Sequence, residues 1–125
     1  MKKIIETKNA PAPIGPYSQA VLSGNTIYTS GQIAMDPITG RLIMESIDAE
    51  TKQVMENMKA VLTEAGMTFE HVIKASIFIS DMDNFASINA VYNQYFSSDY
   101  PARETVEVAR LPKDVNVEIS MIAVK

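Results

Sequence analysis

Short runs of alternating apolar and polar residues in the first third of the chain predict β-strands. The runs are residues 2–6, 17–22 and 26–33. The first two are separated by Ala10-Pro11-Ala12-Pro13-Ile14-Gly15-Pro16, whose prolines and glycine prevent regular structure and predict a rigid, extended loop. Turn residues at 23–25 and 36–40 bound the third run. We therefore expect a β meander in which the loop holds Tyr17 in place.

The middle of the chain has the apolar spacing of helices. Asp48 is a suitable N-cap for a first helix that ends at Gly66. The apolar face of this helix comprises Val54, Met58, Val61, Leu62 and Ala65. Alternation returns at residues 72–80, which predict a strand, and Asp83 is placed to cap a second helix. The apolar stripe of that helix comprises Phe85, Ile88, Tyr92, Tyr95 and Phe96.

Two further strands are predicted at 103–109 and 115–124, joined by Leu111-Pro112-Lys113-Asp114. The order is βββαβαββ, so we predict an α+β fold: a six-stranded mixed sheet with two helices on one face, in a single domain over residues 1–125. The last strand is apolar on both faces. No third helix remains to cover the second face. We therefore expect a homo-oligomer in which sheets pack against each other.

Composition narrows the possible functions. Fifteen acidic and eleven basic residues give a net charge of -4, which disfavours nucleic acid as the main partner. No apolar stretch approaches the ~20 residues of a membrane span, and the first residues do not resemble a signal peptide, so we expect a cytoplasmic protein with no membrane partner. The chain has no cysteine, and its only histidine, His71, has no partner ligand nearby. We expect neither a metal site nor a nucleophilic triad.

Two charged residues stand out in otherwise apolar strands. Alternation places Arg103 on one face of its strand with Thr105, and Glu118 lies between apolar neighbours in the last strand. Buried charges are costly unless they are paired or functional. One interpretation is an ion pair between Arg103 and a glutamate, or solvent exposure. The other is that Arg103 grips a small carboxylate ligand and that Glu118, with a pKa raised by burial, orients a water molecule.

Long ordered stretches carry a family resemblance. They are Pro13-Ile14-Gly15-Pro16-Tyr17-Ser18-Gln19, Thr29-Ser30-Gly31-Gln32-Ile33, Pro101-Ala102-Arg103 and Val106-Glu107-Val108-Ala109-Arg110-Leu111-Pro112-Lys113-Asp114. Together with Ala65-Gly66 and the segment from Asn89 to Tyr92, they resemble the RidA/YjgF family of reactive-intermediate deaminases. The resemblance covers essentially the whole chain.

The resemblance implies a chorismate-mutase-like fold and a homotrimer with clefts at its subunit interfaces. It also implies a hydrolase without a cofactor that deaminates 2-iminobutanoate and 2-iminopropanoate to 2-oxo acids and ammonia, in metabolite damage control. By motif position, Arg103 would bind the substrate carboxylate, Glu118 would position water, and Tyr17 would close one wall of the cleft. The remaining substrate-binding residues implied by the resemblance are Ser30, Gly31, Asn89 and Thr105.

Two residues depart from the family pattern. Thr105 stands where many relatives have cysteine, which removes any thiol chemistry, and Ser120 stands where many have an acidic residue. Two other functions stay open. One is a module that binds 2-oxo acids or amino acids through Arg103 without turning them over. The other is an endoribonuclease, which the acidic balance, the single histidine and the absence of a basic cluster disfavour.

Overall fold

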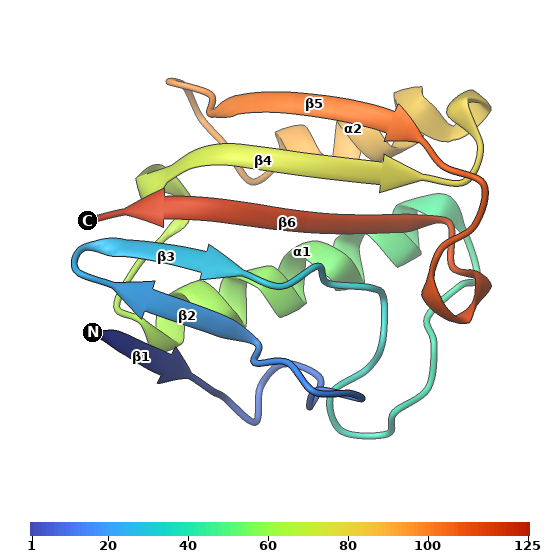
Figure 1. The fold of residues 1–125 in the computed structure, drawn as a ribbon. Coiled ribbons are helices and arrows are strands. Elements are labelled where there is room, and N and C mark those ends of the chain that lie inside the picture. The colour runs from blue at the N-terminus through green and yellow to red at the C-terminus, as the bar shows by residue number, and fades with distance from the viewer.

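The computed structural model describes residues 1–125 as one six-stranded sheet with two α-helices (Figure 1). The strands are β1 (Lys2–Ile5), β2 (Ala20–Ser23), β3 (Thr26–Thr29), β4 (Val72–Ile79), β5 (Ala102–Glu107) and β6 (Val117–Val124). The helices are α1 (Ile47–Glu64) and α2 (Phe85–Asn93), and short 3₁₀ turns span Phe69–His71, Met82–Asn84 and Pro112–Asp114. The predicted order βββαβαββ is confirmed.

The strands lie in the order β1-β2-β3-β6-β4-β5. Every neighbouring pair is antiparallel except β4 and β5, which are parallel and are connected through α2. The sheet is therefore mixed, as predicted, with β1 and β5 at its two edges. Both helices lie behind the sheet in Figure 1, α1 across its middle and α2 behind β4 and β5. None of the helices is long and apolar enough to cross a membrane.

The two faces of the sheet differ in what covers them. On the helix side, Val117, Ile119 and Met121 of β6 are buried in the core with Met58 and Leu62 of α1. The opposite side carries no helix. Side chains on this helix-free side include the exposed apolar residues Ile4, Tyr28, Val106 and Val124. The prediction of a second apolar face without a covering helix is confirmed.

Helix starts differ from the prediction. The hydroxyl of Ser46, not Asp48, caps α1 by accepting from the amide of Ala49 at 3.0 Å. Serine and aspartate cap almost equally well, so the pattern did not separate two positions so close together. The second helix does not start at Asp83. Asp81 caps the 3₁₀ turn that precedes α2, and its carboxylate accepts from the amide of Asp83.

Strand boundaries also differ, chiefly in the meander. The second strand begins at Ala20 rather than at residue 17, and the third ends at Thr29 rather than at residue 33. Tyr17 lies in a turn closed by its amide and the carbonyl of Gly15 at 2.9 Å. Between β3 and α1 the chain makes two isolated bridges, between Gln32 and Ile119 and between Met35 and Leu42. These boundaries leave Tyr17, Ser30 and Gly31 in loops.

Candidate functional site

The guanidinium of Arg103 is held by one face of α2. In the pairing of β4 with β5, Arg103 lies opposite the buried Ala75. The side chain of Arg103 therefore points to the helix side of the sheet. Nη1 donates to Oδ1 of Asn89 at 2.7 Å. The Cζ atom lies 5.0 Å from the ring centroid of Tyr92 and 5.8 Å from that of Phe85. Phe85, Asn89 and Tyr92 follow the helical spacing i, i+4 and i+7, so they share one face of α2.

Arg103 has no carboxylate partner. The two ion pairs of the chain join Lys74 to Glu104 and Arg110 to Asp114. The carboxylate of Glu107, which shares the face of Arg103, instead accepts from the amide of Met82 at 2.7 Å. The interpretation of an internal Arg103–Glu pair is therefore wrong, and so is full exposure, because Arg103 is half-buried. A half-buried guanidinium with donors to spare is suited to a carboxylate ligand.

A cavity of about 290 Å³ lies beside Arg103. Its walls are Asn89, Tyr92, Asn93, Tyr100, Pro101 and Arg103. Ligand pockets start at roughly 300 Å³, so this cavity suits a ligand of a few carbon atoms. The walls supply amide and hydroxyl groups and no second charge. The structure thus brings together three of the predicted residues, since Thr105 lies next to Arg103 and Asn89 in an adjoining small hollow.

Two buried hydroxyls near Arg103 have no hydrogen-bond partner. They belong to Tyr92 and Thr105, and no other buried side-chain nitrogen or oxygen of the chain is unpaired. Burial raises the pKa of Tyr92 to about 12, against the opposing charge of Arg103, so its hydroxyl is protonated at neutral pH. Unpaired buried polar groups are rare and are found preferentially at functional sites. The sequence interpretation placed Tyr92 only in the apolar stripe of the helix.

Glu118 lies on the other side of the sheet from Arg103. It is paired with Phe78 across β4, on the helix-free face, and its carboxylate makes no hydrogen bond within the chain. Burial raises its pKa above the ordinary glutamate value. The start of β6 is anchored nearby, because the buried carboxylate of Glu50 accepts from the amide and the Nδ2 of Asn116, both at 2.7 Å. The predicted water-positioning residue therefore has a raised pKa and a fixed backbone.

Gly31 lies directly against Glu118. The backbones of Gln32 and Ile119 exchange two hydrogen bonds of 2.8 and 3.2 Å, which brings the preceding Gly31 beside β6. A Cβ added at Gly31 would fall 2.7 Å from the carboxyl carbon of Glu118, closer than real Cβ contacts. Any side chain at position 31 would therefore displace the side chain of Glu118. The amide of Gly31 donates no hydrogen bond within the chain, so it is available to a ligand.

Ser30 and Tyr17 have intramolecular partners. The hydroxyl of Ser30 donates to the carbonyl of Ser18 at 2.6 Å, which leaves it only as an acceptor for a ligand. The hydroxyl of Tyr17 accepts from the amide of Ile14 at 3.3 Å, so its own proton is free to be donated. Tyr17 is 48% exposed and lines a small hollow with Gly31. The structure thus forms a second group from Tyr17, Gly31 and Glu118.

The loop before Tyr17 is organised by the buried side-chain amide of Gln19. Its Oε1 accepts from the amide of Thr7, and its Nε2 donates to the carbonyls of Thr7, Ala10 and Pro11, at distances from 2.7 to 3.2 Å. This amide replaces the hydrogen bonds that the proline-rich loop cannot make itself. The sequence interpretation did not identify Gln19. A glutamine next to a loop with several prolines is the only signal that the sequence offers.

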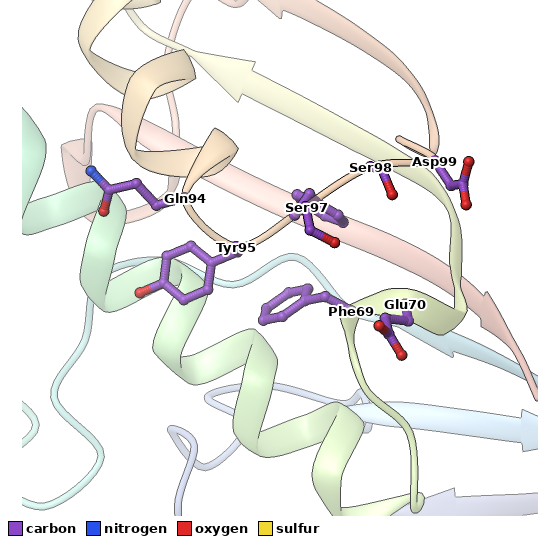
Figure 2. Close-up of a pocket in the computed structure, with 8 residues that line it drawn as sticks. Phe69, Glu70, Gln94, Tyr95, Ser97, Ser98 and Asp99 are labelled. Atoms are coloured by element: carbon purple, nitrogen blue, oxygen red, sulfur yellow. The ribbon is translucent and has the colours of Figure 1, made fainter.

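A larger hollow of about 340 Å³ lies elsewhere, between the Phe69–His71 turn and the segment after α2 (Figure 2). Figure 2 shows the ring of Tyr95 turned away from Glu70 and Asp99. The hydroxyl of Tyr95 is bonded to Glu56 at 2.7 Å. The polar groups of this hollow do not converge on one point, and no cation lines it. We therefore regard the surroundings of Arg103 and Glu118 as the candidate site.

The fold and these two groups define a small α+β protein that carries an arginine without a carboxylate partner and a partly desolvated glutamate on opposite sides of one sheet. No group of three or more histidine, aspartate or glutamate side chains is arranged to hold a metal ion. The family model described as Endoribonuclease L-PSP matches residues 7–125.

Relatives match over nearly the whole chain. A RutC family protein of Pyrococcus horikoshii is 51% identical, with 100% of this chain and 99% of the relative covered. The 2-iminobutanoate/2-iminopropanoate deaminase of Bos taurus is 49% identical, with 100% of this chain and 91% of the relative covered. The crystal structure of E. coli TdcF with bound serine has a TM-score of 0.95 and 46% identity, covering 98% of both chains. The chain therefore belongs to the RidA/YjgF/L-PSP family, as the sequence motifs predicted.

Proposed function

We propose that the protein hydrolyses small 2-imino acids to 2-oxo acids and ammonia, in sites that two copies of the chain form together. The observation that carries the proposal is the guanidinium of Arg103, half-buried beside a small cavity and without a carboxylate partner. Relatives at 44 to 49% identity are named 2-iminobutanoate/2-iminopropanoate deaminases. A serine bound to a structural relative supports a small ligand that carries a carboxylate.

The placement of the two groups supports a site shared between chains. Arg103 and Glu118 lie on opposite faces of one sheet, so they cannot act on one small molecule within a single chain. Arg103 is on the edge strand β5, from which it can reach a neighbouring molecule. Glu118 is on the helix-free face, whose exposed apolar side chains favour coverage by another sheet.

This arrangement favours a closed ring of subunits. A contact between the β5 edge of one copy and the helix-free face of the next joins two different surfaces. Such heterologous contacts generate rings when the rotation closes, whereas a two-fold dimer would join identical surfaces. The homotrimer implied by the family resemblance is a ring of this kind, with three equivalent sites. We propose this trimer as the active form.

In the proposed reaction, Arg103 grips the substrate carboxylate with two parallel charge-assisted hydrogen bonds. Glu118 from the neighbouring copy takes a proton from a water molecule as the water oxygen attacks the imine carbon, and the C=N bond becomes a C–N single bond. Glu118 delivers this proton to the nitrogen, which gives a carbinolamine. The carbinolamine hydroxyl then passes its proton through Glu118 to the nitrogen, and the C–N bond breaks as the C=O bond forms, which releases ammonia and leaves the 2-oxo acid. The pKa of Glu118, raised by burial, brings it nearer to the working pH of a general base.

The other residues would complete the polar lining. The free amide of Gly31 and the hydroxyl of Tyr17 can donate to the substrate, and the hydroxyl oxygen of Ser30 can accept. Asn89 acts through Arg103, to which it is bonded. Thr105 offers a buried hydroxyl without a partner. The reaction needs no cofactor, because an imine is already electrophilic and positioning supplies most of the rate.

A coupled assay tests the proposal. A dehydratase or an amino-acid oxidase generates 2-iminobutanoate or 2-iminopropanoate in place, and formation of the oxo acid is timed with and without the protein. We expect acceleration that Arg103→Ala removes while light scattering shows an unchanged trimer. Arg110→Ala is the matched control, because Arg110 is exposed and paired with Asp114. An assembled wild-type protein that gives no acceleration would refute the proposal.

The structure of a relative with bound serine favours a second candidate, a module that binds amino acids or 2-oxo acids without turnover. Glu118→Gln separates the two functions. A hydrolase with this substitution should keep its affinity for 2-oxobutanoate and lose turnover. A binding module would show the same affinity for both proteins and no turnover from either. The name endoribonuclease in the family description has no support in the site, which offers one arginine and no basic cluster for RNA.

A further inference from the structure

We propose that Phe85 and Tyr92 are positioning residues, which hold the guanidinium of Arg103 by their ring faces and leave its charge available to the substrate carboxylate. The inference deepens the proposed function and rests on it. It assigns a role to the face of α2 that the sequence interpretation treated as apolar packing alone. It also explains why the arginine has aromatic and amide neighbours instead of an acid.

The geometry places both rings in contact range of one cation. The Cζ of Arg103 lies 5.0 Å from the ring centroid of Tyr92 and 5.8 Å from that of Phe85, within the roughly 6 Å over which cation–π attraction acts. Asn89, between them on the helix, fixes Nη1 at 2.7 Å. The guanidinium therefore has three contacts from one helix face, and none of them is charged.

The ring of Tyr92 is itself fixed from behind. Its centroid lies 4.8 Å from that of Phe96, and Phe96 in turn packs against the edge of Phe69 at 5.5 Å. Tyr92 is 3% exposed, so its ring has little freedom to turn. Phe85 differs, because it is 37% exposed and contributes less to the core. An aromatic residue at a partly exposed helix position, with a cation over its ring, is better explained by this contact than by packing.

The choice of aromatic neighbours has a consequence for ligand binding. A carboxylate next to Arg103 would hold it in place but would also neutralise it, and a ligand would have to displace that carboxylate. An aromatic ring attracts the cation through its quadrupole and removes no charge. The rings thus restrict the guanidinium without competing for its hydrogen-bond donors. A ligand carboxylate then meets a cation that is already oriented and only partly hydrated.

Leucine substitutions test the proposal. In Phe85→Leu and Tyr92→Leu the ring face is lost and an apolar side chain remains, whereas Tyr92→Phe keeps the ring and is the matched control. Titration calorimetry on the assembled protein measures affinity for 2-oxobutanoate and for its neutral amide. We expect each leucine variant to bind the acid roughly 5- to 30-fold more weakly. Affinity of the leucine variants for the amide should stay within twofold of wild type, and Tyr92→Phe should bind the acid more tightly than Tyr92→Leu does.

Steady-state kinetics give a second readout. Loss of positioning at the carboxylate should raise KM for the imino acid by a similar factor and leave kcat nearly unchanged. Leucine variants that weaken acid and amide binding equally would overturn the proposal in favour of general packing. Tyr92→Phe as weak as Tyr92→Leu would overturn it in favour of the hydroxyl. If Tyr92→Leu does not fold, the acid and amide affinities of Phe85→Leu test the proposal alone, because Phe85 is the more exposed residue.

The binding arm is independent of catalysis. A wild-type protein that binds 2-oxobutanoate and does not accelerate imine hydrolysis would refute the proposed function. The leucine variants would still test whether the rings of Phe85 and Tyr92 position Arg103, a role called the clamp below. Normal hydrolysis and normal acid affinity in both leucine variants would overturn the clamp and leave the proposed function intact. A wild-type protein that binds no 2-oxo acid would overturn both.

Discussion

The two halves of the candidate site are supported in different ways. The half around Arg103 is built by one helix face, which supplies two rings and an amide oxygen to the guanidinium. The half around Glu118 combines the strand β6, which carries the glutamate, with loops. There, Gly31 and Tyr17 lie in segments without regular structure, and the carboxylate of Glu118 makes no hydrogen bond within the chain.

This difference indicates which half is complete in a single chain. The arginine is already oriented before any ligand or second copy arrives, because its contacts come from its own α2. The glutamate lies on a face that has no helix and whose apolar side chains are exposed. In the proposed trimer, its surroundings depend on the copy that covers that face. Substitutions in the two halves should therefore have different consequences, for affinity in the first and for turnover and stability in the second.

The largest expected effect on stability comes from Gln19→Leu, in the loop half. The change removes four hydrogen bonds and leaves a part-buried amide and three carbonyls to find other partners. We expect the free energy of unfolding to fall by about 3 kcal/mol. Urea unfolding at one fixed protein concentration measures it. Gln53→Leu, which removes a single amide contact with Asn57, is the control and should cost less than about 1 kcal/mol. Equal losses would show that Gln19 has no special role.

Gly31→Ala should damage turnover more than binding. Its Cβ would lie 2.7 to 2.8 Å from atoms of the Glu118 side chain, which must then move. Misplacing a catalytic group by about 1 Å can cost on the order of 100-fold in rate, so we expect kcat to fall by up to that factor. Affinity for 2-oxobutanoate should change by less. Gly15→Ala is the control, because its Cβ would meet Tyr17 at an ordinary 3.5 Å. Normal kcat in Gly31→Ala would contradict the assignment of Glu118.

Asn89→Asp tests whether ligand binding depends on Arg103 having no carboxylate partner. The new carboxylate would stand where Oδ1 now accepts from Arg103 at 2.7 Å, and would neutralise the guanidinium. We expect roughly 10- to 100-fold weaker binding of 2-oxobutanoate, with an unfolding temperature equal to wild type or higher. Asn93→Asp adds the same charge to the same cavity without a bond to Arg103, and its effect should be smaller. Equal effects would show that net charge, not pairing, controls affinity.

The smallest expected effect is on the pH dependence of stability. Burial raises the pKa of Glu118 above its ordinary 4.5, so the folded state binds this proton more tightly than the unfolded state. The free energy of unfolding therefore falls as pH rises from 4.5 to the raised pKa of Glu118 in the folded protein. The loss of stability persists at higher pH. Glu118→Gln should unfold at a higher temperature than wild type above this pH range, and the difference should shrink on acidification. Glu64→Gln, on the exposed side of α1, is the control. A constant difference at all pH values would contradict the raised pKa.

Much of the fold could be predicted from local pattern. Alternation identified the faces of β5 and β6 correctly, and helical spacing identified both helices. Arg103 and Glu118 were recognisable as charges within apolar strands. These features depend on neighbours in sequence, which the pattern records directly.

The opposite placement of Arg103 and Glu118 could not be predicted in this way. Alternation alone favours a common outer face for the polar residues of both strands. Strand pairing instead places Arg103 and Glu118 on opposite faces of the sheet, because the side of β5 that carries Arg103 is turned toward α2. Tyr92 and Gln19 were missed for a related reason. Their partners lie 8 to 12 residues away along the chain, outside the spacing of a helix or strand pattern. A tyrosine in an apolar helix stripe or a single glutamine has the same local pattern whether or not it supports a site.

The position of β6 has a consequence for how the protein is made. It is the last strand in chain order, yet it lies between β3 and β4, which do not pair with each other. During synthesis, the meander and the β4–α2–β5 unit leave the ribosome before the strand that joins them. Their inner edges stay unpaired until residues 117–124 emerge. Glu118 arrives on that same strand, so its half of the site cannot form while the nascent sheet is still in two parts.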